Sequence, residues 1–503
     1  MNILRALLAS VSAACAATLS IGGPTSSPEE PRRAIPWQTW EEAKRSSGGS
    51  NERPIYLYLG SKLSELSRET ERQTFARAET AAWLALHFVC VRIDEATDPE
   101  IAAFVQDLVE RVRQQKGPPY HVWLTPRFEP FEAAGYLPPA EEWSQPGFLK
   151  TARAALGVWL DHPDAAVASA RELQSLASPE VPSATLPSVA ALLERGTAAW
   201  IAAEDQAHGG FGEAPKEPHA DVIRFLLHRG PAAREAALRA TAALVGGALQ
   251  DPSDGGFFCR TIDEAWREPY RQKRLIDQAR IAVALLDADQ VVNRPEWRHA
   301  AHRALRFGLT HLRHPEGGFF AALDFTEGAA PDGTVGLASL AAQGVFLRAL
   351  IRAGEPFRDE AEAVARHLRT LFQPTLPSPS TAPARTLAPS PADLLGAAFG
   401  LSLSPVADDR SLARELTRTA FARHHDTRTG LFWAVSADGA ALLPWRPLAI
   451  PSPIRPESLA LTIGVDPSSR EQLLRSLRHT IEFDPLPPAE ILIALARDAE
   501  SVP

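Results

Sequence analysis

Cysteine is scarce in this sequence: there are three among 503 residues, and no two of them form a C-x-x-C pair. A disulfide scaffold is therefore excluded. Basic residues are not in excess, because 52 Lys and Arg face 61 Asp and Glu, for a formal net charge of -9. Nucleic-acid binding needs clustered Lys and Arg, so we expect no DNA or RNA partner. Beyond the first 25 residues no apolar run reaches the roughly 20 residues that a bilayer requires, so we expect no membrane-spanning segment.

The sequence does contain enough apolar residues for a folded protein of more than one domain. Hydrophobic residues make up 45% of the chain, a normal share for globular proteins, and the length corresponds to two or three domains. The 43 prolines predict frequent breaks between short elements. We expect a polar spacer at 24–34, a first domain at 35–177, a linker at 178–187, and a second domain at 188–503 with a Pro-rich insert at 374–391.

The first 23 residues have the pattern of an export signal. Arg5 precedes the uncharged stretch LLASVSAACAATLSI, which offers small-residue cleavage points around Cys15. We therefore predict a periplasmic or extracellular protein; a short buried helix or a tail on a cytoplasmic protein is the alternative. Cys15 lacks the leucine expected three residues before a lipid-attachment cysteine. Without this segment only Cys90 and Cys259 remain, far apart in sequence, so no structural disulfide is expected.

Short β-branched runs alternate with helical segments in the first domain. The sequence predicts strands at 54–60, 88–94 and 118–126, and helices at 39–47, 64–86 and 99–115. This alternation indicates a sheet with parallel neighbours, covered by helices. The order, with a proline opening the third strand, is that of a thioredoxin, and Pro119 is the candidate cis-proline. His121 and Cys90 lie in predicted strands, so we expect both to be core residues.

Four stretches of this domain resemble the thioredoxin-domain family typified by spermatogenesis-associated protein 20. They read RPIYLYLGSKLSELSRETERQTF, FVCVRIDEATDPEI, KGPPYHVWLTP and GYLPP, at matching intervals. The resemblance places Ser64 and Ser67 where the family has two cysteines. Thiol–disulfide exchange needs a thiolate and a resolving thiol, which serine cannot supply. The resemblance therefore implies a redox-inactive domain, in which Ser64 fits as a helix N-cap and Ser67 lies in the first turn.

The second domain is predicted to be all helical. Apolar residues spaced three and four apart indicate a dozen amphipathic helices, at 188–205, 221–229, 231–249, 274–289, 295–312, 337–353, 359–372, 391–401, 411–424, 456–464, 469–481 and 488–499. A weak repeat interleaves them, at Gly209–Gly212, Gly255–Phe258, Gly317–Phe320 and Gly430–Trp433. Helical hairpins with recurring turns favour an (α/α)6 toroid, and an open superhelical solenoid is the alternative.

The resemblance to the same family continues through GGFGEAPKEPH (from Gly209), GGFFCRTIDEAWREPYRQKRLIDQA (from Gly255) and GGFFAALDFTEG (from Gly317). It implies an (α/α)6 domain like that of N-acylglucosamine 2-epimerases and six-hairpin glycosidases, with a carbohydrate-type cleft. Where the family has two histidines and a glutamate, this chain has Cys259, Tyr270 and Gln272. Each change removes a group that could carry a proton near neutral pH.

Seven charged or titratable residues remain in the predicted cleft: His219, Arg260, Asp263, Lys273, Asp277, Asp324 and Glu327. Asp277 and Asp324 are candidate paired carboxylates for acid–base work on a sugar, with His219 as a further catalytic candidate. The other four are candidate binding residues. We expect Asp277 to be partly buried near Asp324, with Arg260 or Lys273 as its partner. The alternative is structural: an ion pair of Asp277 with Arg260, and Asp324 as a turn cap.

Two functions follow from these observations. The first is a redox-inactive thioredoxin-like protein whose toroid binds a carbohydrate-like or other small ligand. The alternative is a sugar isomerase, epimerase or hydrolase that uses the acidic residues of the cleft. No metal-binding or cofactor motif is present, so neither function is expected to need a metal or cofactor. The sequence does not indicate an oligomeric state.

Overall fold

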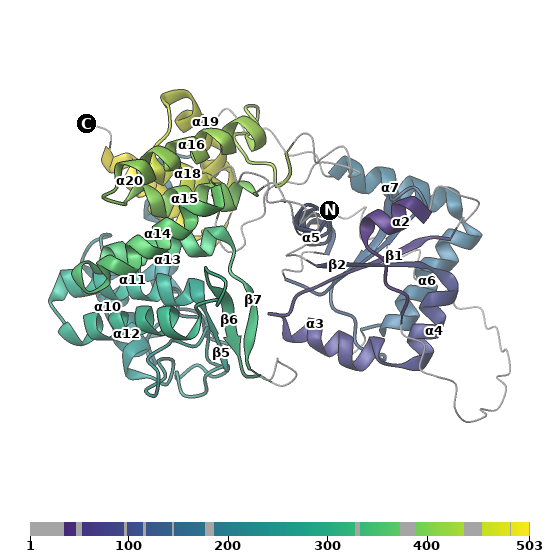
Figure 1. Ribbon diagram of the computed structural model, residues 1–503, viewed down its shortest axis with the longest axis horizontal. Helices are drawn as coiled ribbons and strands as arrows, with labels where there is room; N and C mark the ends of the chain where they lie inside the picture. The colour runs from purple at the N-terminus through teal and green to yellow at the C-terminus, as the bar shows by residue number, and fades with distance from the viewer. Residues whose placement is uncertain are drawn as a thin grey trace. The chain divides into compact units, whose positions relative to one another are not determined.

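The computed structural model describes residues 35–46, 53–94, 98–113, 117–142, 145–176, 186–326, 332–372, 389–436, 455–482 and 484–501. The predicted export signal, the polar spacer and most of the linker and Pro-rich insert lie outside these residues. The chain divides near residue 178 into two compact units, which are described separately (Figure 1).

The first unit is built on a four-stranded sheet in the order β2-β1-β3-β4. The central strand β1 (Ile55–Gly60) runs parallel to β2 (Val89–Asp94) and antiparallel to β3 (Tyr120–Leu124), which pairs in turn with the antiparallel edge strand β4 (Pro130–Ala134). This is the thioredoxin-like sheet that the order of elements predicts. Only one of its three pairings is parallel, and β4 is an additional strand.

Helices cover both faces of this sheet (Figure 1). Side chains alternate along β1, so Ile55, Leu57 and Leu59 pack with α2 (Trp40–Ser46) and α5 (Pro99–Arg113). Tyr56 and Tyr58 face the other way, toward α4 (Ala78–His87) and α6 (Phe148–Asp161). A further helix, α7 (Pro163–Leu176), lies against β4 and α6. All residues of β1 except the last are buried, which explains its continuous apolar run.

The predicted helix at 64–86 is interrupted. It consists of α3 (Glu65–Glu69), a π-helical turn at Thr70–Phe75, and α4, which begins after Arg77 in an extended conformation. The Thr70 hydroxyl donates to the carbonyl oxygen of Leu66 at 2.8 Å. A threonine that bonds back in this way competes with regular helical hydrogen bonding, which accounts for the irregularity at this residue.

The second unit contains an inner ring of six helices. They are α9 (Ala220–Leu226), α11 (Leu275–Val292), α13 (Leu340–Ala353), α15 (Pro391–Ser402), α18 (Pro456–Ile463) and α20 (Ala489–Ser501). Each contacts the next, and α20 contacts α9. The ring is therefore closed, and the open solenoid is excluded. Its tightest contact joins α13 and α15, where a Cβ atom on Gly344 would lie 1.9 Å from the Gly396 carbonyl oxygen.

Six outer helices pack against this ring. They are α8 (Val189–Ala202), α10 (Pro231–Gly246), α12 (Pro295–His311), α14 (Arg358–Phe372), α16 (Ala407–His424) and α19 (Pro467–Ile481). Inner and outer helices alternate along the chain, which makes the described part of this unit an (α/α)6 toroid (Figure 1). The twelve predicted helices correspond one to one with these twelve.

The glycine repeat forms four similar turns, each leading from an outer helix toward an inner one. In three copies an aspartate (Asp205, Asp251 or Asp426) accepts a hydrogen bond from the backbone N–H two residues later. The third copy has His314 in this place. The first glycine of each copy has a positive φ, at 73° for Gly209, 83° for Gly255, 106° for Gly317 and 75° for Gly430. Glycine is required there because other residues rarely adopt this conformation.

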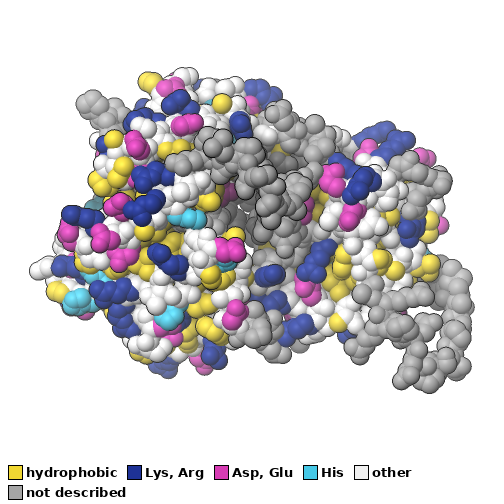
Figure 2. All heavy atoms as spheres, viewed as in Figure 1, with side chains coloured by type: hydrophobic (Ala, Val, Ile, Leu, Met, Phe, Trp, Pro, Cys, Tyr) yellow, Lys and Arg dark blue, Asp and Glu magenta, His cyan; other side chains and the backbone are white. Residues whose placement is uncertain are grey.

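A small antiparallel sheet, in the order β5-β6-β7, accompanies these turns. It consists of β5 (Gln272–Arg274), β6 (Phe320–Asp324) and β7 (Thr334–Leu337). Within the described ranges, no helix has the length and hydropathy needed to cross a bilayer. On the face shown in Figure 2, basic and acidic side chains are interspersed rather than gathered by sign.

Candidate functional site

Ser64 and Ser67, the serines predicted to stand at the redox positions, lie at the start of α3. Ser64 is the N-cap of α3, and its hydroxyl accepts from the backbone N–H of Ser67 at 3.2 Å. The same hydroxyl donates to the carbonyl oxygen of Pro118 at 2.7 Å. The Pro118–Pro119 peptide is cis, as predicted for Pro119. The capping role predicted for Ser64 is thus confirmed, and both of its hydrogen-bonding capacities are used locally.

Neither described cysteine is placed for redox chemistry. Cys90 lies in β2 and Cys259 lies after the second glycine turn, and both are buried and free. Burial raises the pKa of Cys90 to about 12 and that of Cys259 to about 11. Both groups are therefore thiols at neutral pH, whereas exchange requires a thiolate.

We expect the purified protein to reduce insulin no faster than the uncatalysed reaction with dithiothreitol. The double variant Ser64→Cys with Ser67→Cys places two thiols at the N-cap and first turn of a helix, a position that lowers thiol pKa values. It should form an intramolecular disulfide, visible by mass spectrometry as a loss of two hydrogens. Ser64→Cys alone is the matched control. A folded, oxidised double variant with only free thiols would contradict the placement.

Asp277 is held by a partner other than the two predicted. It lies in the first turn of α11 and is 8% exposed. Its Oδ2 atom accepts from Nε of Arg274 at 2.5 Å, so the predicted partners Arg260 and Lys273 are both wrong. Arg274 is three residues earlier, at a spacing that brings side chains together across one helical turn. The negative charge of Asp277 raises the pKa of Arg274.

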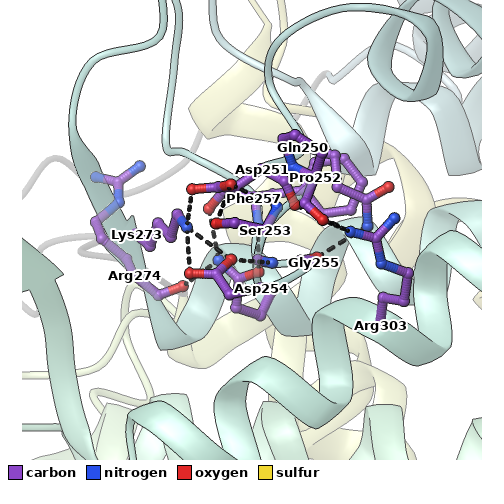
Figure 3. Close-up of polar contacts among 12 residues, drawn as sticks. Gln250, Asp251, Pro252, Ser253, Asp254, Gly255, Phe257, Lys273, Arg274 and Arg303 are labelled. Atoms are coloured by element: carbon purple, nitrogen blue, oxygen red, sulfur yellow. Dashed lines mark hydrogen bonds and ion pairs between the residues drawn. The ribbon is translucent and has the colours of Figure 1, made fainter.

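Lys273 points away from this pair. Because successive residues of a strand face opposite sides, Lys273 of β5 is directed toward the second glycine turn (Figure 3). Its Nζ atom lies 2.8 Å from Asp251 and 2.7 Å from Asp254, and also contacts the ring faces of Phe258 and Phe307. The side chain is 2% exposed. Lys273 therefore anchors the turn and does not line a cleft.

Asp324 and Asp263 are also engaged in local structure. Asp324 is fully buried; one carboxylate oxygen accepts from the Gln272 amide at 2.7 Å and the other from Thr326, through its backbone N–H at 2.9 Å and its hydroxyl at 2.5 Å. Asp263 accepts from the backbone N–H groups of Ala265, Arg267 and Glu268. These contacts are those of turn caps. Glu327, the remaining acidic candidate, lies outside the described residues.

Arg260 lies in the same region as Asp277, whereas His219 packs against an outer helix. Arg260 stacks on Tyr270, 4.4 Å from the ring centroid. Cys259 interacts electrostatically with Arg274, Asp277 and Arg260, which places the four groups in one region. His219 precedes α9 in a left-handed conformation and packs on Trp200 at 5.4 Å. Burial lowers the pKa of His219 despite the nearby charge of Glu217.

A second group of charges, which the sequence argument missed, lies at the start of the inner helices. Asp221 is in the first turn of α9, Arg280 near the start of α11, and Glu490 in the first turn of α20. Arg280 bridges the two carboxylates, with Nε 3.4 Å from Asp221 and a terminal nitrogen 3.5 Å from Glu490. Arg455, just before α18, lies 3.6 Å from Glu490. We call Asp221, Arg280, Arg455 and Glu490 the mouth cluster.

The side chains of the mouth cluster are between 19% and 25% exposed, so they are accessible to solvent without being on an open surface. Nearby Glu457 is only 3% exposed and accepts from the backbone N–H of Phe432 at 3.1 Å. It therefore ties the fourth glycine turn to α18. Gln278 ties the second glycine turn to α11, because its side-chain oxygen accepts from the backbone N–H of Phe257 at 2.7 Å.

The two carboxylates bridged by Arg280 have different proton affinities. Burial would raise the pKa of Asp221, but Arg280 and Arg224 together lower it below its usual value. Burial raises the pKa of Glu490, an effect that Arg280 opposes and Asp221 reinforces. Two acidic groups whose pKa values are displaced in opposite directions are the usual arrangement for one ionised and one protonated partner in acid–base chemistry.

One signal in the sequence does correspond to the mouth cluster. Five of the six inner helices carry an acidic residue in the first turn: Asp221, Asp277, Asp393, Glu457 and Glu490. In a single helix such a residue only complements the helix dipole. In a closed ring of parallel inner helices the same positions converge. The described residues include no group of three His, Cys, Asp or Glu side chains that could hold a metal ion.

The two units define a protein with a thioredoxin-like domain followed by an (α/α)6 toroid. Residues 29–177 match the family described as Thioredox_DsbH, protein of unknown function, DUF255. Spermatogenesis-associated protein 20 of Homo sapiens is 27% identical over 304 residues, which cover 58% of this chain and 39% of that protein. An uncharacterised protein of Caenorhabditis elegans is 23% identical over 301 residues, 58% of this chain and 41% of its own. The first unit thus matches the model of this family, and the chain is similar in sequence to these relatives.

The chain thus spans about two fifths of the length of these relatives. Among solved structures, cellobiose 2-epimerase from Spirochaeta thermophila is 17% identical and covers 66% of this chain and 98% of its own, with a TM-score of 0.45. A sugar epimerase from a ruminal bacterium is 11% identical, covers 63% and 99%, and has a TM-score of 0.48. The toroid itself is established by the closed ring of inner helices.

Proposed function

We propose that the toroid binds a small polyhydroxyl ligand, such as a carbohydrate, at the mouth cluster, and that the thioredoxin-like domain does not exchange disulfides. The observation that carries this proposal is the pair of carboxylates, Asp221 and Glu490, held on either side of Arg280 where three inner helices begin. The serines at 64 and 67 support the second part, as does the family resemblance that aligns them with cysteines.

The chemistry of the mouth cluster suits hydroxyl groups. Carboxylates accept hydrogen bonds and guanidinium groups only donate them, whereas each sugar hydroxyl does both. Adjacent hydroxyls of one ring can therefore bond to Glu490 and Arg280 together. The ion-pair distances of 3.4 to 3.6 Å are longer than an optimal charge-assisted hydrogen bond. Replacing one of these long ion-pair contacts by a hydrogen bond to a ligand therefore costs little free energy.

Thermal-shift measurements with glucose, mannose, N-acetylglucosamine and cellobiose test this proposal. A ligand at 100 times its Kd stabilises the folded state by about 2.7 kcal/mol, so at least one sugar should raise the melting temperature of the toroid. Glu490→Gln should abolish that rise. The variant should itself melt at a slightly higher temperature without sugar, because the raised pKa of Glu490 means that its ionisation destabilises the fold at neutral pH.

Glu362→Gln is the matched control, because Glu362 pairs with Arg366 on an outer helix and is 53% exposed. It should respond to sugar as the wild type does. A sugar that stabilises Glu490→Gln and the wild type equally would contradict the proposed site.

A second candidate function is supported by the opposed pKa displacements of Asp221 and Glu490. Asp221, whose pKa is lowered, is suited to remove a proton, and Glu490, whose pKa is raised, is suited to return one, as sugar isomerisation or epimerisation requires. Proton NMR of the same sugars in D2O separates the two functions. Incorporation of deuterium at a ring carbon, lost in Glu490→Gln, would support catalysis, whereas binding without exchange would support a binding protein.

A further inference from the structure

Four arginines lie in the later halves of three inner helices. Arg224 belongs to α9, Arg348 and Arg352 to α13, and Arg497 to α20. Arg348 interacts electrostatically with Arg224 and Arg497, which places these groups close together inside the ring. Asp287 of α11 is the carboxylate between them. We call Arg224, Arg348, Arg352 and Arg497 the arginine cluster.

The carboxylates in this region are already shared. Asp287 accepts from Arg352 at 2.9 Å through one oxygen and from Arg224 at 3.1 Å through the other. Asp221 pairs with Arg224 at 3.0 Å and with Arg280 of the mouth cluster. The four guanidinium groups therefore face only two carboxylates, one of which, Asp221, is shared with Arg280. Glu500 offsets little of the remaining positive charge, since it is 69% exposed and pairs with Arg229.

Two of the four arginines have no carboxylate partner in the part of the chain that the structure describes. Among the described residues, neither Arg348 nor Arg497 forms an ion pair within 4 Å. Arg348 is half-buried and stacks on Phe399, with its guanidinium carbon 4.4 Å from the ring centroid. Stacking uses the face of the guanidinium group and leaves its N–H donors, which lie in the plane, available.

Burial and neighbouring positive charges make the charged form of the Arg348 side chain unfavourable when no anion is bound. Burial and the positive charges of Arg224 and Arg497 lower the pKa of Arg348 to about 9. The negative ends of the helix dipoles offset part of this cost, but each such contact is worth only about 0.3–1 kcal/mol. An anion would offset more, because each guanidinium can bond to two of its oxygens.

We propose that the arginine cluster binds the phosphate or sulfate group of a small molecule. Arg224 and Arg352 meet at Asp287. Arg348 lies close to Arg224 and Arg497. Arg348 and Arg497 have no ion-pair partner among the described residues, and Arg497 is exposed, so solvent reaches the site.

The arginine cluster adjoins the mouth cluster, because Asp221 pairs with Arg224 of the first and with Arg280 of the second. Asp287, at the centre of the arginine cluster, is seven residues beyond Arg280 on α11, which corresponds to about 10 Å along the helix. Phosphate binding around Arg348 does not require that neutral sugars bind at the mouth.

Calorimetric titration of the full chain with inorganic phosphate, and separately with sulfate, tests this site. Chloride at equal ionic strength is the reference, because screening by salt alone changes surface electrostatics. We expect the wild type to bind phosphate, sulfate or both, and Arg348→Gln to bind them at least tenfold more weakly. Arg348→Lys keeps the charge without the planar fork and should fall between them.

Arg306→Gln is the control, because Arg306 is exposed on α12 beside the ring of Phe357. It should bind phosphate as the wild type does. Removal of Arg348 relieves repulsion within the cluster, so the variant should melt no lower than the wild type without phosphate. Absence of phosphate and sulfate binding in the wild type would overturn the proposal, as would equal binding by Arg348→Gln. Loss of sugar binding with intact phosphate binding would overturn only the function proposed for the mouth.

Discussion

The thioredoxin-like unit is expected to lose about 5 kcal/mol of stability between pH 7 and pH 3 through one buried histidine. His121 is fully buried in β3, with Nδ1 2.6 Å from the Tyr56 hydroxyl and no partner for Nε2 among the described residues. Burial lowers its pKa from 6.5 to about 3. One pKa unit corresponds to about 1.36 kcal/mol, which gives the expected loss of about 5 kcal/mol.

The direction of this change in stability depends on whether the folded or the unfolded state binds the proton. Between pH 6.5 and 3 the unfolded chain protonates His121 while the folded chain does not, so stability falls as the pH falls. His121→Gln keeps a hydrogen-bonding group for Tyr56 but does not titrate. Urea unfolding followed by near-ultraviolet circular dichroism should show a much smaller loss for this variant. His162→Gln, at an exposed histidine in the same unit, is the control and should keep the wild-type slope. Equal slopes for His121→Gln and the wild type would contradict the assignment.

The second large effect is expected at Lys273. Lys273→Ala removes the cation between Asp251 and Asp254 (Figure 3). It also empties the space beside Phe258 and Phe307. The two aspartates are about a quarter exposed, so water can solvate them in part. Because repulsion and a cavity act together, we expect a loss of about 3 kcal/mol in the toroid.

Lys273→Met separates the two contributions, since it keeps most of the apolar stem and removes only the charge. Its loss should be about half that of Lys273→Ala. The control is Arg366→Ala, which breaks the exposed pair with Glu362 and should cost under about 1 kcal/mol. Calorimetry, in which the two units can be followed as separate transitions, measures these differences. A Lys273→Ala toroid as stable as the control would show that the cluster does not anchor the turn.

The helical part of the fold was largely predictable from local patterns. The spacing of apolar residues located all twelve toroid helices, because each has one face against its neighbours. The repeat located the glycine turns, because a positive φ selects glycine at each copy. The edge strand β4 is not predictable in this way, since PFEAA has no β-branched residue. The interruption near Thr70 depends on a side-chain hydrogen bond, which residue type alone does not specify.

The candidate site was less predictable because its residues are distant in sequence. Asp277 pairs with Arg274, three residues earlier, and this contact could be inferred from the spacing of the two residues in the sequence. The direction of Lys273 depends on β5, whose residues QKR give no strand signal. The mouth cluster joins Asp221, Arg280 and Glu490, which meet only because α20 closes the ring onto α9. The spacing of residues in the sequence does not predict that α20 contacts α9.

Hydrogen–deuterium exchange with and without sugar tests the central claim most directly, namely that the toroid mouth is the binding site. The measurement uses the full chain and whichever sugar of the panel gives the largest thermal shift. We predict slower exchange at the first turns of α9 and α20 and at the second turn of α11, where Asp221, Glu490 and Arg280 lie, and no change around Ser64 in the thioredoxin-like unit. Protection confined to residues near Ser64, or unchanged exchange at all three helix starts with the sugar bound, would contradict the account.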